Sequence, residues 1–247
     1  MKLALAQLAS APLDIAGNLA SHLYAVERAA AAGAELVAFP ELSLTGYWLD
    51  RLGDRAFAAD DTAFDPLQDA AERFHCAILA GLPTRSSAGR HISQAVFRPD
   101  SARQVYAKQL LHNDEQPYFI GGDTPLAPKV GETQIGPAIC YESLHPTHAE
   151  AAREAGAEVY LACVAKTDAD VANALDYMAS LAQRLTMAVA LVNGIGESEG
   201  FESAGGSAAW SEKGRLVAQL PYREQGLLIW DPESTEAEVI MLDTTLC

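Results

Sequence analysis

Three side chains of complementary chemistry stand at the ends of three predicted strands. Cys140 closes the apolar run at 135–140, Glu41 follows the apolar run at 36–39, and Lys108 ends the run at 103–108. A thiol that loses its proton is a nucleophile, a carboxylate can take that proton, and an ammonium can stabilise an oxyanion. Ligands of α/β proteins bind beyond the carboxyl ends of strands, so one pocket can collect all three groups. Together they indicate nucleophilic catalysis.

Each residue alone has a plainer explanation. Free cysteines are commonly buried, and glutamate and lysine side chains are mostly exposed, so Cys140 would be structural and the two charged residues solvated. The combination favours chemistry. A helix that begins just after Cys140 and a nearby Lys108 would both lower the pKa of the thiol. Partial burial beside Phe39 and Pro40 would raise the pKa of Glu41 and suit it to general base catalysis.

Strands and helices alternate along the chain and would hold these side chains in place. Short apolar runs predict strands at 3–8, 36–39, 77–80, 133–140, 159–162 and 189–192. Helical spacing and end signals predict four helices. They are 18–32, capped by Asn18 and ended by Gly33; 66–74, capped by Asp65; 149–155, ended by Gly156; and 170–187.

Two parts of the chain depart from this alternation and indicate antiparallel hairpins. Residues 94–98 and 103–108 flank a turn at 99–101, and the chain closes with runs at 206–210, 216–220 and 227–230.

All-apolar strands must be covered on both faces, whereas the helices have one apolar stripe. We therefore expect an α/β fold, a four-layer α-β-β-α sandwich. No linker or repeat interrupts the chain, which predicts a single domain over residues 1–247.

Three short motifs, in chain order, resemble the signatures of the nitrilase superfamily of carbon–nitrogen hydrolases. They are FPELSLTGY at 39–47, YAK at 106–108 and ICYE at 139–142, and the resemblance extends to 191–193 and 206–214. It implies the same sandwich, with Glu41 as general base and acid, Lys108 as stabiliser of the tetrahedral intermediate and Cys140 as nucleophile. It also implies a second oxyanion donor, the N–H of Tyr141. A further pocket glutamate is matched by Glu115, although Asp114 stands beside it.

The resemblance implies a hydrolase of a small linear amide that forms a cysteine thioester and releases ammonia or an amine, without a cofactor or metal. Hydrolysis of a nitrile or an N-carbamoyl group and acyl transfer by the same triad stay open. A non-catalytic member that only binds a partner is the competing hypothesis. Homo-oligomers, dimers or larger, are also implied. Residues 181–185 (LAQRL) depart from the frequent Arg-Ala…Glu-Asn pattern, and His145 replaces a common aromatic residue, so the substrate stays open.

Composition excludes other classes of function. With 17 basic and 33 acidic residues the formal charge is −16, which argues against nucleic acid or an anionic membrane as the partner. The chain lacks a run of about 18 apolar residues and a signal-peptide pattern, so we expect a cytoplasmic protein with a small-molecule substrate. No Cys/His spacing indicates a zinc site or disulfides. We expect Cys76 and Cys163 to lie in the core, and we expect no role for Cys247 at the end of the chain.

Other residues could join the site or have structural roles. His145 and His148 would bind a metal only if further ligands joined them, and the sequence pairs none with them. A dyad of one of them with Cys140 is disfavoured because the motif that surrounds the cysteine of papain-like peptidases is absent. Lys166 either meets an acidic substrate group or is solvated. Aromatic side chains near the motifs either line the pocket or pack in the core. These are Tyr47, the one that we include among the supporting residues, and Trp48 and Tyr118.

Overall fold

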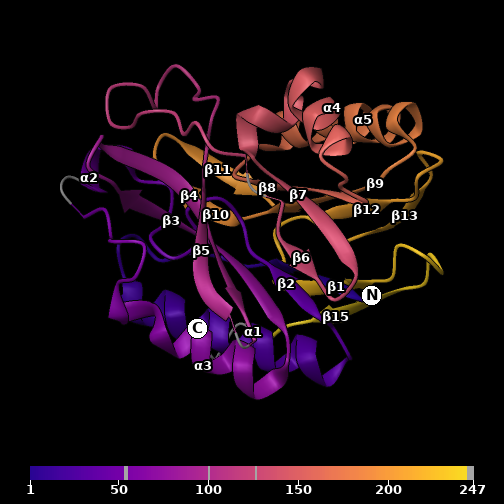
Figure 1. The fold of residues 1–247 in the computed structure, drawn as a ribbon, viewed down its shortest axis with the longest axis horizontal. Helices are drawn as coiled ribbons and strands as arrows, with labels where there is room; N and C mark the ends of the chain where they lie inside the picture. Colours follow the sequence, from indigo (N-terminus) through magenta and orange to yellow (C-terminus); the bar gives the residue numbers. More distant parts are fainter. Residues whose placement is uncertain (53–54, 100, 126, 244–247) are drawn as a thin grey trace.

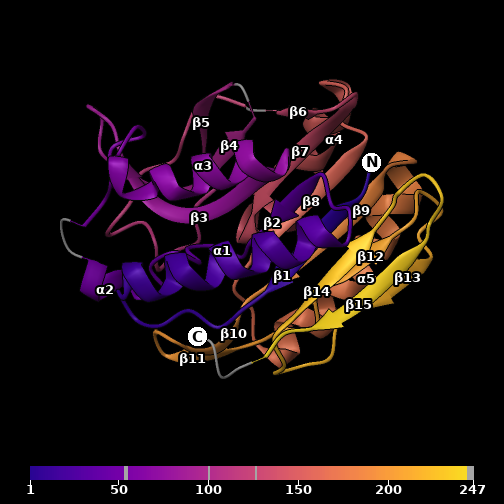
Figure 2. The same ribbon diagram turned by 90° about the horizontal axis from the view of Figure 1, so that it is seen from below.

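Two β-sheets stacked face to face form the centre of the molecule, and helices cover the outer face of each sheet (Figure 1). The computed structural model describes residues 1–52, 55–99, 101–125 and 127–243, so Asp100 of the predicted turn and Cys247 lie outside the described residues. Figure 2 shows α1 (Ile15–Ala31) and α3 (Asp65–Phe74) side by side across the first sheet. The second sheet is covered by α4 (Pro146–Glu154) and α5 (Asp168–Leu185). The predicted four-layer α-β-β-α sandwich is confirmed.

Both sheets have parallel strands at their centre and antiparallel strands at their edges. The first has the order β15 (Ala237–Met241), β14 (Gly226–Trp230), β1 (Leu3–Gln7), β2 (Leu36–Ala38), β3 (Ala77–Arg85), β4 (Arg90–Arg98) and β5 (Ser101–Ala107). The second has the order β13 (Leu216–Gln219), β12 (Ala208–Trp210), β9 (Ala188–Asn193), β8 (Val159–Val164), β7 (Thr133–Ile139) and β6 (Lys129–Val130). A separate hairpin pairs β10 (Ile195–Ser198) with β11 (Phe201–Ala204).

The alternation of side chains along β1 shows how the layers pack. Leu3 and Leu5 lie in the apolar layer between the two sheets, whereas Ala4 and Ala6 face the helices α1 and α3. Successive side chains of a strand point to opposite faces, so a fully apolar strand contributes to both layers. The small alanine side chains let α1 approach the sheet closely. This double burial is the reason that the central strands are recognisable as short apolar runs.

Two predicted helix caps are wrong. Helix α1 begins at Ile15, and its cap is Asp14, whose side chain accepts a hydrogen bond from the N–H of Gly17. Asn18 instead lies within the helix, where its side chain bonds the backbone of Ala11 and Leu44. Helix α3 includes Asp65 because a 3₁₀ turn, Thr62–Phe64, leads directly into it. Asn18 is engaged by Leu44, which is distant in the sequence, and the cap position of α3 is Phe64, which has no side-chain cap hydrogen bond.

Other elements match their predictions within a few residues or were not predicted. The hairpin of β4 and β5 and the strands β12 to β14 are confirmed, and α4 begins three residues before the predicted start. Strand β7 ends at Ile139 and not at 140, since the next residue turns into a 3₁₀ helix, Cys140–Leu144. The sequence did not predict β6, β10, β11, β15 and the short α2 (Leu49–Leu52). Within the described ranges, none of the helices combines the length and the apolar composition that crossing a membrane requires.

Candidate active site

The loop that follows β2 places Glu41 inside the molecule. Leu42 has φ +51°, in the left-handed region, so the chain turns sharply at this point. The Glu41 side chain beside the turn is buried, with 3% of the residue exposed. Gly81 of β3 lies against the turn. A Cβ at Gly81 would lie 2.3 Å from the carbonyl oxygen of Pro40 and 2.4 Å from the nitrogen of Leu42. Only glycine lets the two backbones come this close, so β3 holds the Glu41 loop from behind.

A buried histidine supports the same loop from the side of α1. His22 stacks on Phe39 at 4.0 Å, and its Nε2 lies 2.9 Å from Oγ of Ser43. Its Nδ1 lies 2.6 Å from the carbonyl oxygen of Asn18, which can only accept, so Nδ1 carries the hydrogen and the Ser43 hydroxyl donates to Nε2. Burial lowers the pKa of His22 to about 4. The neutral ring is therefore a fixed support for the loop at neutral pH.

Lys108 lies between two carboxylates. It follows β5, and its ammonium donates to Oε1 of Glu41 at 2.7 Å and to Oε1 of Glu115 at 2.5 Å, with its own side chain completely buried. Glu115 is held in turn by the hydroxyl of Tyr47 at 3.1 Å and by the backbone N–H of His112 at 2.8 Å. Burial disfavours the ammonium, but the adjacent carboxylates outweigh it and raise the pKa of Lys108. The ammonium thus stays charged.

Glu41 has a free oxygen in this arrangement. Burial raises the pKa of Glu41 to about 7; Lys108 opposes this rise, and the negative charge of Glu115 adds to it. Oε1 of Glu41 accepts from Lys108, whereas its Oε2 is buried without a hydrogen-bond partner among the described residues. A carboxylate that is half ionised near neutral pH and has one unpaired oxygen can accept and return a proton. The expected rise in the pKa of Glu41 is confirmed.

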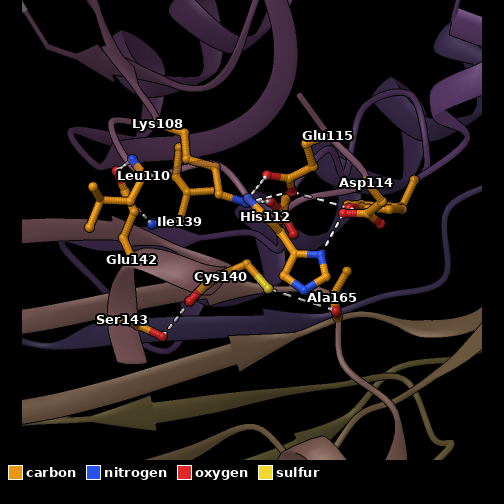
Figure 3. Close-up of polar contacts among 12 residues, drawn as sticks. Lys108, Leu110, His112, Asp114, Glu115, Ile139, Cys140, Glu142, Ser143 and Ala165 are labelled. Carbon is orange, nitrogen blue, oxygen red and sulfur yellow. Dashed lines mark hydrogen bonds and ion pairs between the residues drawn. The ribbon is translucent and has the colours of Figure 1, made fainter. Parts of the chain in front are cut away.

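Cys140 occupies a strained backbone position at the end of β7. Its φ is +44°, in the left-handed region that non-glycine residues rarely adopt. The thiol points toward the carbonyl oxygen of Ala165, 3.9 Å from Sγ (Figure 3). Burial and the negative charge of Glu41 raise the pKa of the thiol to about 11, against the opposing effect of Lys166 and Lys108. The expected lowering of this pKa is therefore wrong, because burial outweighs both cations.

Glu142 is a buried carboxylate of the site that sequence reasoning missed. Its Oε2 accepts from the N–H of Ile139 at 2.7 Å, and its Oε1 accepts from the N–H groups of Gln109 and Leu110 (Figure 3). One side chain therefore ties the residue before Cys140 to the residues after Lys108. A glutamate three residues after a strand end that bonds back to its N–H is half of a capping box, and this spacing was the available signal.

His148 continues this network away from the site. The hydroxyl of Tyr106 donates to the Glu142 carboxylate at 2.9 Å and lies 2.8 Å from Nε2 of His148, whose Nδ1 lies 2.8 Å from the hydroxyl of Tyr160. Tyr106 has one hydrogen, which it gives to Glu142, so Nε2 of His148 must be the donor and Nδ1 the acceptor. Burial lowers the pKa of His148 to about 4. Both ring nitrogens are thus occupied by tyrosines rather than by Cys140.

The remaining predicted residues divide between the site and the core. His145 packs its ring edge-on against Tyr141, and no group of three or more potential metal-binding side chains occurs in the described part of the chain. Tyr118 packs in the same apolar cluster as Tyr47. Trp48 is buried beneath the guanidinium of Arg51. Cys76 and Cys163 are fully buried, as expected, and Lys166 is buried rather than solvated.

A narrow cavity of about 20 Å³ opens beside these groups. Glu41, Tyr47 and Ala165 line it, together with Gly194, which lies between β9 and β10, and Ile195, the first residue of β10. This volume accommodates about one water molecule. The site as it stands therefore accepts only a slim group next to Glu41.

We predict that Glu142→Gln lowers the free energy of unfolding by about 2 kcal/mol, because an amide has one acceptor oxygen for the four donors that the carboxylate now satisfies. Urea denaturation measures the change. The control is Glu150→Gln, which removes an exposed ion pair with Arg184 and should cost less than about 1 kcal/mol. Equal effects of the two substitutions would contradict the role assigned to Glu142.

Solved structures with the same fold include an amidase from Nesterenkonia sp. AN1. One structure, a mutant that shows Michael addition of acrylamide at the active site cysteine, has 26% sequence identity and a TM-score of 0.84, covering 94% of this chain and 92% of that chain. Another, a mutant in complex with butyramide, has 25% identity and a TM-score of 0.83, covering 98% and 90%. The fold and the order of the elements are therefore those of an amidase of the nitrilase superfamily.

Sequence comparisons agree with this. The protein named hydrolase in pqqF 5'region, from Pseudomonas protegens, is 36% identical over 170 residues, covering 65% of this chain and 58% of its own length. Glutamine-dependent NAD(+) synthetase of Thermotoga maritima is 28% identical over 248 residues, covering 96% and 42%. The chain thus spans about half the length of these curated relatives. The family described as carbon-nitrogen hydrolase matches residues 2–238, and the chain belongs to this family within the nitrilase superfamily.

Proposed function

We propose that the protein hydrolyses a small linear amide through a thioester on Cys140. The observation that carries the proposal is the buried ammonium of Lys108, held by Glu41 and Glu115 beside a half-buried thiol. Among mutants of the Nesterenkonia amidase, which has the same fold, one shows Michael addition of acrylamide at the active site cysteine and another is in complex with butyramide.

In the first step, Oε2 of Glu41 takes the proton of the Cys140 thiol while Sγ attacks the carbonyl carbon of the amide. The carbonyl oxygen becomes an oxyanion, and the ammonium of Lys108 and the N–H of Tyr141 stabilise it. Tyr141 lies in the first turn of the 3₁₀ helix, where an N–H has no acceptor within the helix. Glu41 then gives its proton to the amide nitrogen, the C–N bond breaks, and ammonia leaves a thioester on Cys140.

In the second step, water replaces ammonia beside Glu41. Glu41 removes a proton from the water as its oxygen attacks the thioester carbon, and the same two donors stabilise the new oxyanion. The C–S bond breaks, the sulfur takes the proton back from Glu41, and the carboxylic acid leaves. Each step returns Glu41 to its ionised state, and the second step restores the Cys140 thiol, so the cycle needs only the amide and water.

The same groups can act on other carbon–nitrogen bonds. A nitrile, an N-carbamoyl group or a non-water acyl acceptor would use the same attack by Cys140, and the curated relatives include an arylacetonitrilase that is 24% identical.

A purely binding role is disfavoured because it would not require the three buried charged groups, those of Lys108, Glu41 and Glu115. Assembly into dimers or larger homo-oligomers and a cytoplasmic location stay predictions.

We predict that Cys140→Ala abolishes ammonia release from butyramide and that Glu41→Gln lowers kcat/KM by about 10²–10⁴-fold, since it removes the proton acceptor. A coupled ammonia assay measures both. Cys76→Ala is the matched control, because its thiol is buried away from the site and its loss should leave turnover unchanged. Turnover by Cys140→Ala at the wild-type rate would rule out the proposed nucleophile.

The pH dependence follows from Glu41. Its carboxyl group accepts a proton only when ionised, and burial raises its pKa to about 7. We therefore expect kcat/KM for a neutral amide to rise with pH and to reach half of its plateau near pH 7. Butyramide has no titrating group in this range, so the profile reports the enzyme. A value of kcat/KM that falls as the pH rises through 7 would contradict a base role for Glu41.

A further inference from the structure

The cavity beside Glu41 is too small for an amide substrate. Its volume of about 20 Å³ accommodates about one water molecule, and even acetamide is several times larger than water. The proposed reaction therefore requires one wall of this cavity to move. The walls fall into two groups, one that belongs to the stacked sheets and the loops at their strand ends, and one that the β10–β11 hairpin forms.

The walls that belong to the stacked sheets are fixed by buried contacts. The Glu41 loop lies directly against the backbone of β3 at Gly81. Ala165 follows β8, and the N–H of the next residue, Lys166, donates to Oδ1 of Asn193 at 2.9 Å. Closely packed interiors resist displacement, because a shift of one group opens voids or clashes around it. These walls therefore keep their positions while the protein is folded.

The hairpin supplies the other wall. The residues that line the cavity from it are Ile195, Glu197 and Ser198 of β10 and Ser203 of β11. The hairpin forms a two-stranded sheet of its own, outside the two stacked sheets (Figure 2). Two strands alone are marginally stable in water, so contacts with the rest of the molecule decide where the hairpin lies.

Backbone hydrogen bonds anchor the base of the hairpin. The N–H of Ile195 donates to the carbonyl oxygen of Leu8 at 3.1 Å, and the N–H of Ala204 donates to the carbonyl oxygen of Lys166 at 2.9 Å. Ile195 and Ala204 are paired with each other, so both strands are tied to the sheets at the same level. The next residue of β10, Gly196, has φ +84°, which favours glycine and gives the hairpin a bend point just beyond its anchored base.

A glutamate and an aromatic contact hold the tip of the hairpin. The N–H of Glu199 donates to the carbonyl oxygen of Tyr47 at 2.8 Å, and Oε2 of Glu199 accepts from the N–H of Asp50 at 3.1 Å. The ring of Phe201 packs edge-on against the ring of Tyr47, with centroids 5.4 Å apart. Glu199 thus joins the tip to the loop that carries Tyr47, which lines the opposite side of the cavity.

We propose that the hairpin tip is the movable wall of the acyl pocket and that Glu199 determines how large an acyl group the site accepts. The tip turns outward about its anchored base to admit the amide, and the Glu199 bonds return it. A short acyl group lets these bonds re-form, whereas a long one keeps them broken, so Glu199 selects against long chains. This inference rests on the proposed function, because it names a specificity-determining residue of the same site.

The test compares hexanamide with acetamide, two neutral amides that differ only in acyl length. We expect Glu199→Ala to raise the ratio of kcat/KM for hexanamide to kcat/KM for acetamide by about 3–10-fold, since it removes the bond to the N–H of Asp50. Glu199→Gln keeps an acceptor oxygen and should stay within about twofold of the wild-type ratio. The control Glu202→Ala removes an exposed ion pair with Arg223 on the same hairpin and should leave the ratio unchanged.

A second measurement needs no turnover. Alkylation of Cys140 by 2-iodo-N-phenylacetamide and by iodoacetamide, followed by peptide mass spectrometry, compares how fast a large and a small group reach the thiol. Glu199→Ala should raise the ratio of the two rates, and Glu202→Ala should not. Phe201→Leu weakens the other contact of the tip and should act in the same direction as Glu199→Ala, so it replaces that variant if thermal unfolding shows Glu199→Ala to be unfolded.

The two measurements separate the movable wall from the hydrolysis. A hydrolysis ratio or an alkylation ratio that does not respond to Glu199→Ala, or that rises equally in Glu202→Ala, would overturn the inference. A raised alkylation ratio in a protein that releases no ammonia from either amide would instead overturn the hydrolysis and leave the movable wall in place.

Discussion

The buried ion cluster of Lys108 with Glu41 and Glu115 is the constraint on which the rest of the site depends. Three charges out of water are stable only if each has its counter-charge and its remaining hydrogen bonds. Tyr47 and the N–H of His112 therefore hold Glu115, and the close backbone contact at Gly81 holds the Glu41 loop. The Glu41 loop and the Tyr47 contact to Glu115 thus both serve to hold the two carboxylates that bind the Lys108 ammonium.

The same cluster governs the proton that the proposed reaction moves. Transfer from a thiol with a pKa raised to about 11 to a carboxylate with a pKa raised to about 7 is unfavourable in the resting site. It becomes favourable only as sulfur bonds to the carbonyl carbon, because the new oxyanion next to Lys108 then replaces the charge that Glu41 loses. The resting thiol thereby stays protonated until a substrate arrives.

The sequence predicted the layers, because short apolar runs locate the parallel strands. It also predicted that Glu41 and Lys108 lie together, because each of them follows the end of a strand. It did not predict Glu142, whose donors come from Tyr106 and from the chain after Lys108, more than 30 residues away. The cap at Asp14 and the direction of the thiol pKa were also missed. The thiol pKa depends on how much water the fold removes, and Asn18 is engaged by the distant Leu44, whereas the Asp14 cap is a local bond to Gly17 that the sequence reading overlooked.

The central claim is that Cys140 carries the acyl group. Rapid mixing of the wild-type protein with butyramide, acid quenching and peptide mapping by mass spectrometry test it directly. We expect the peptide that contains Cys140 to gain the mass of a butyryl group within one turnover, and the peptides that contain Cys76 and Cys163 to gain none. Ammonia release with no butyryl group on Cys140 at any mixing time, or with the group on another residue, would contradict the account.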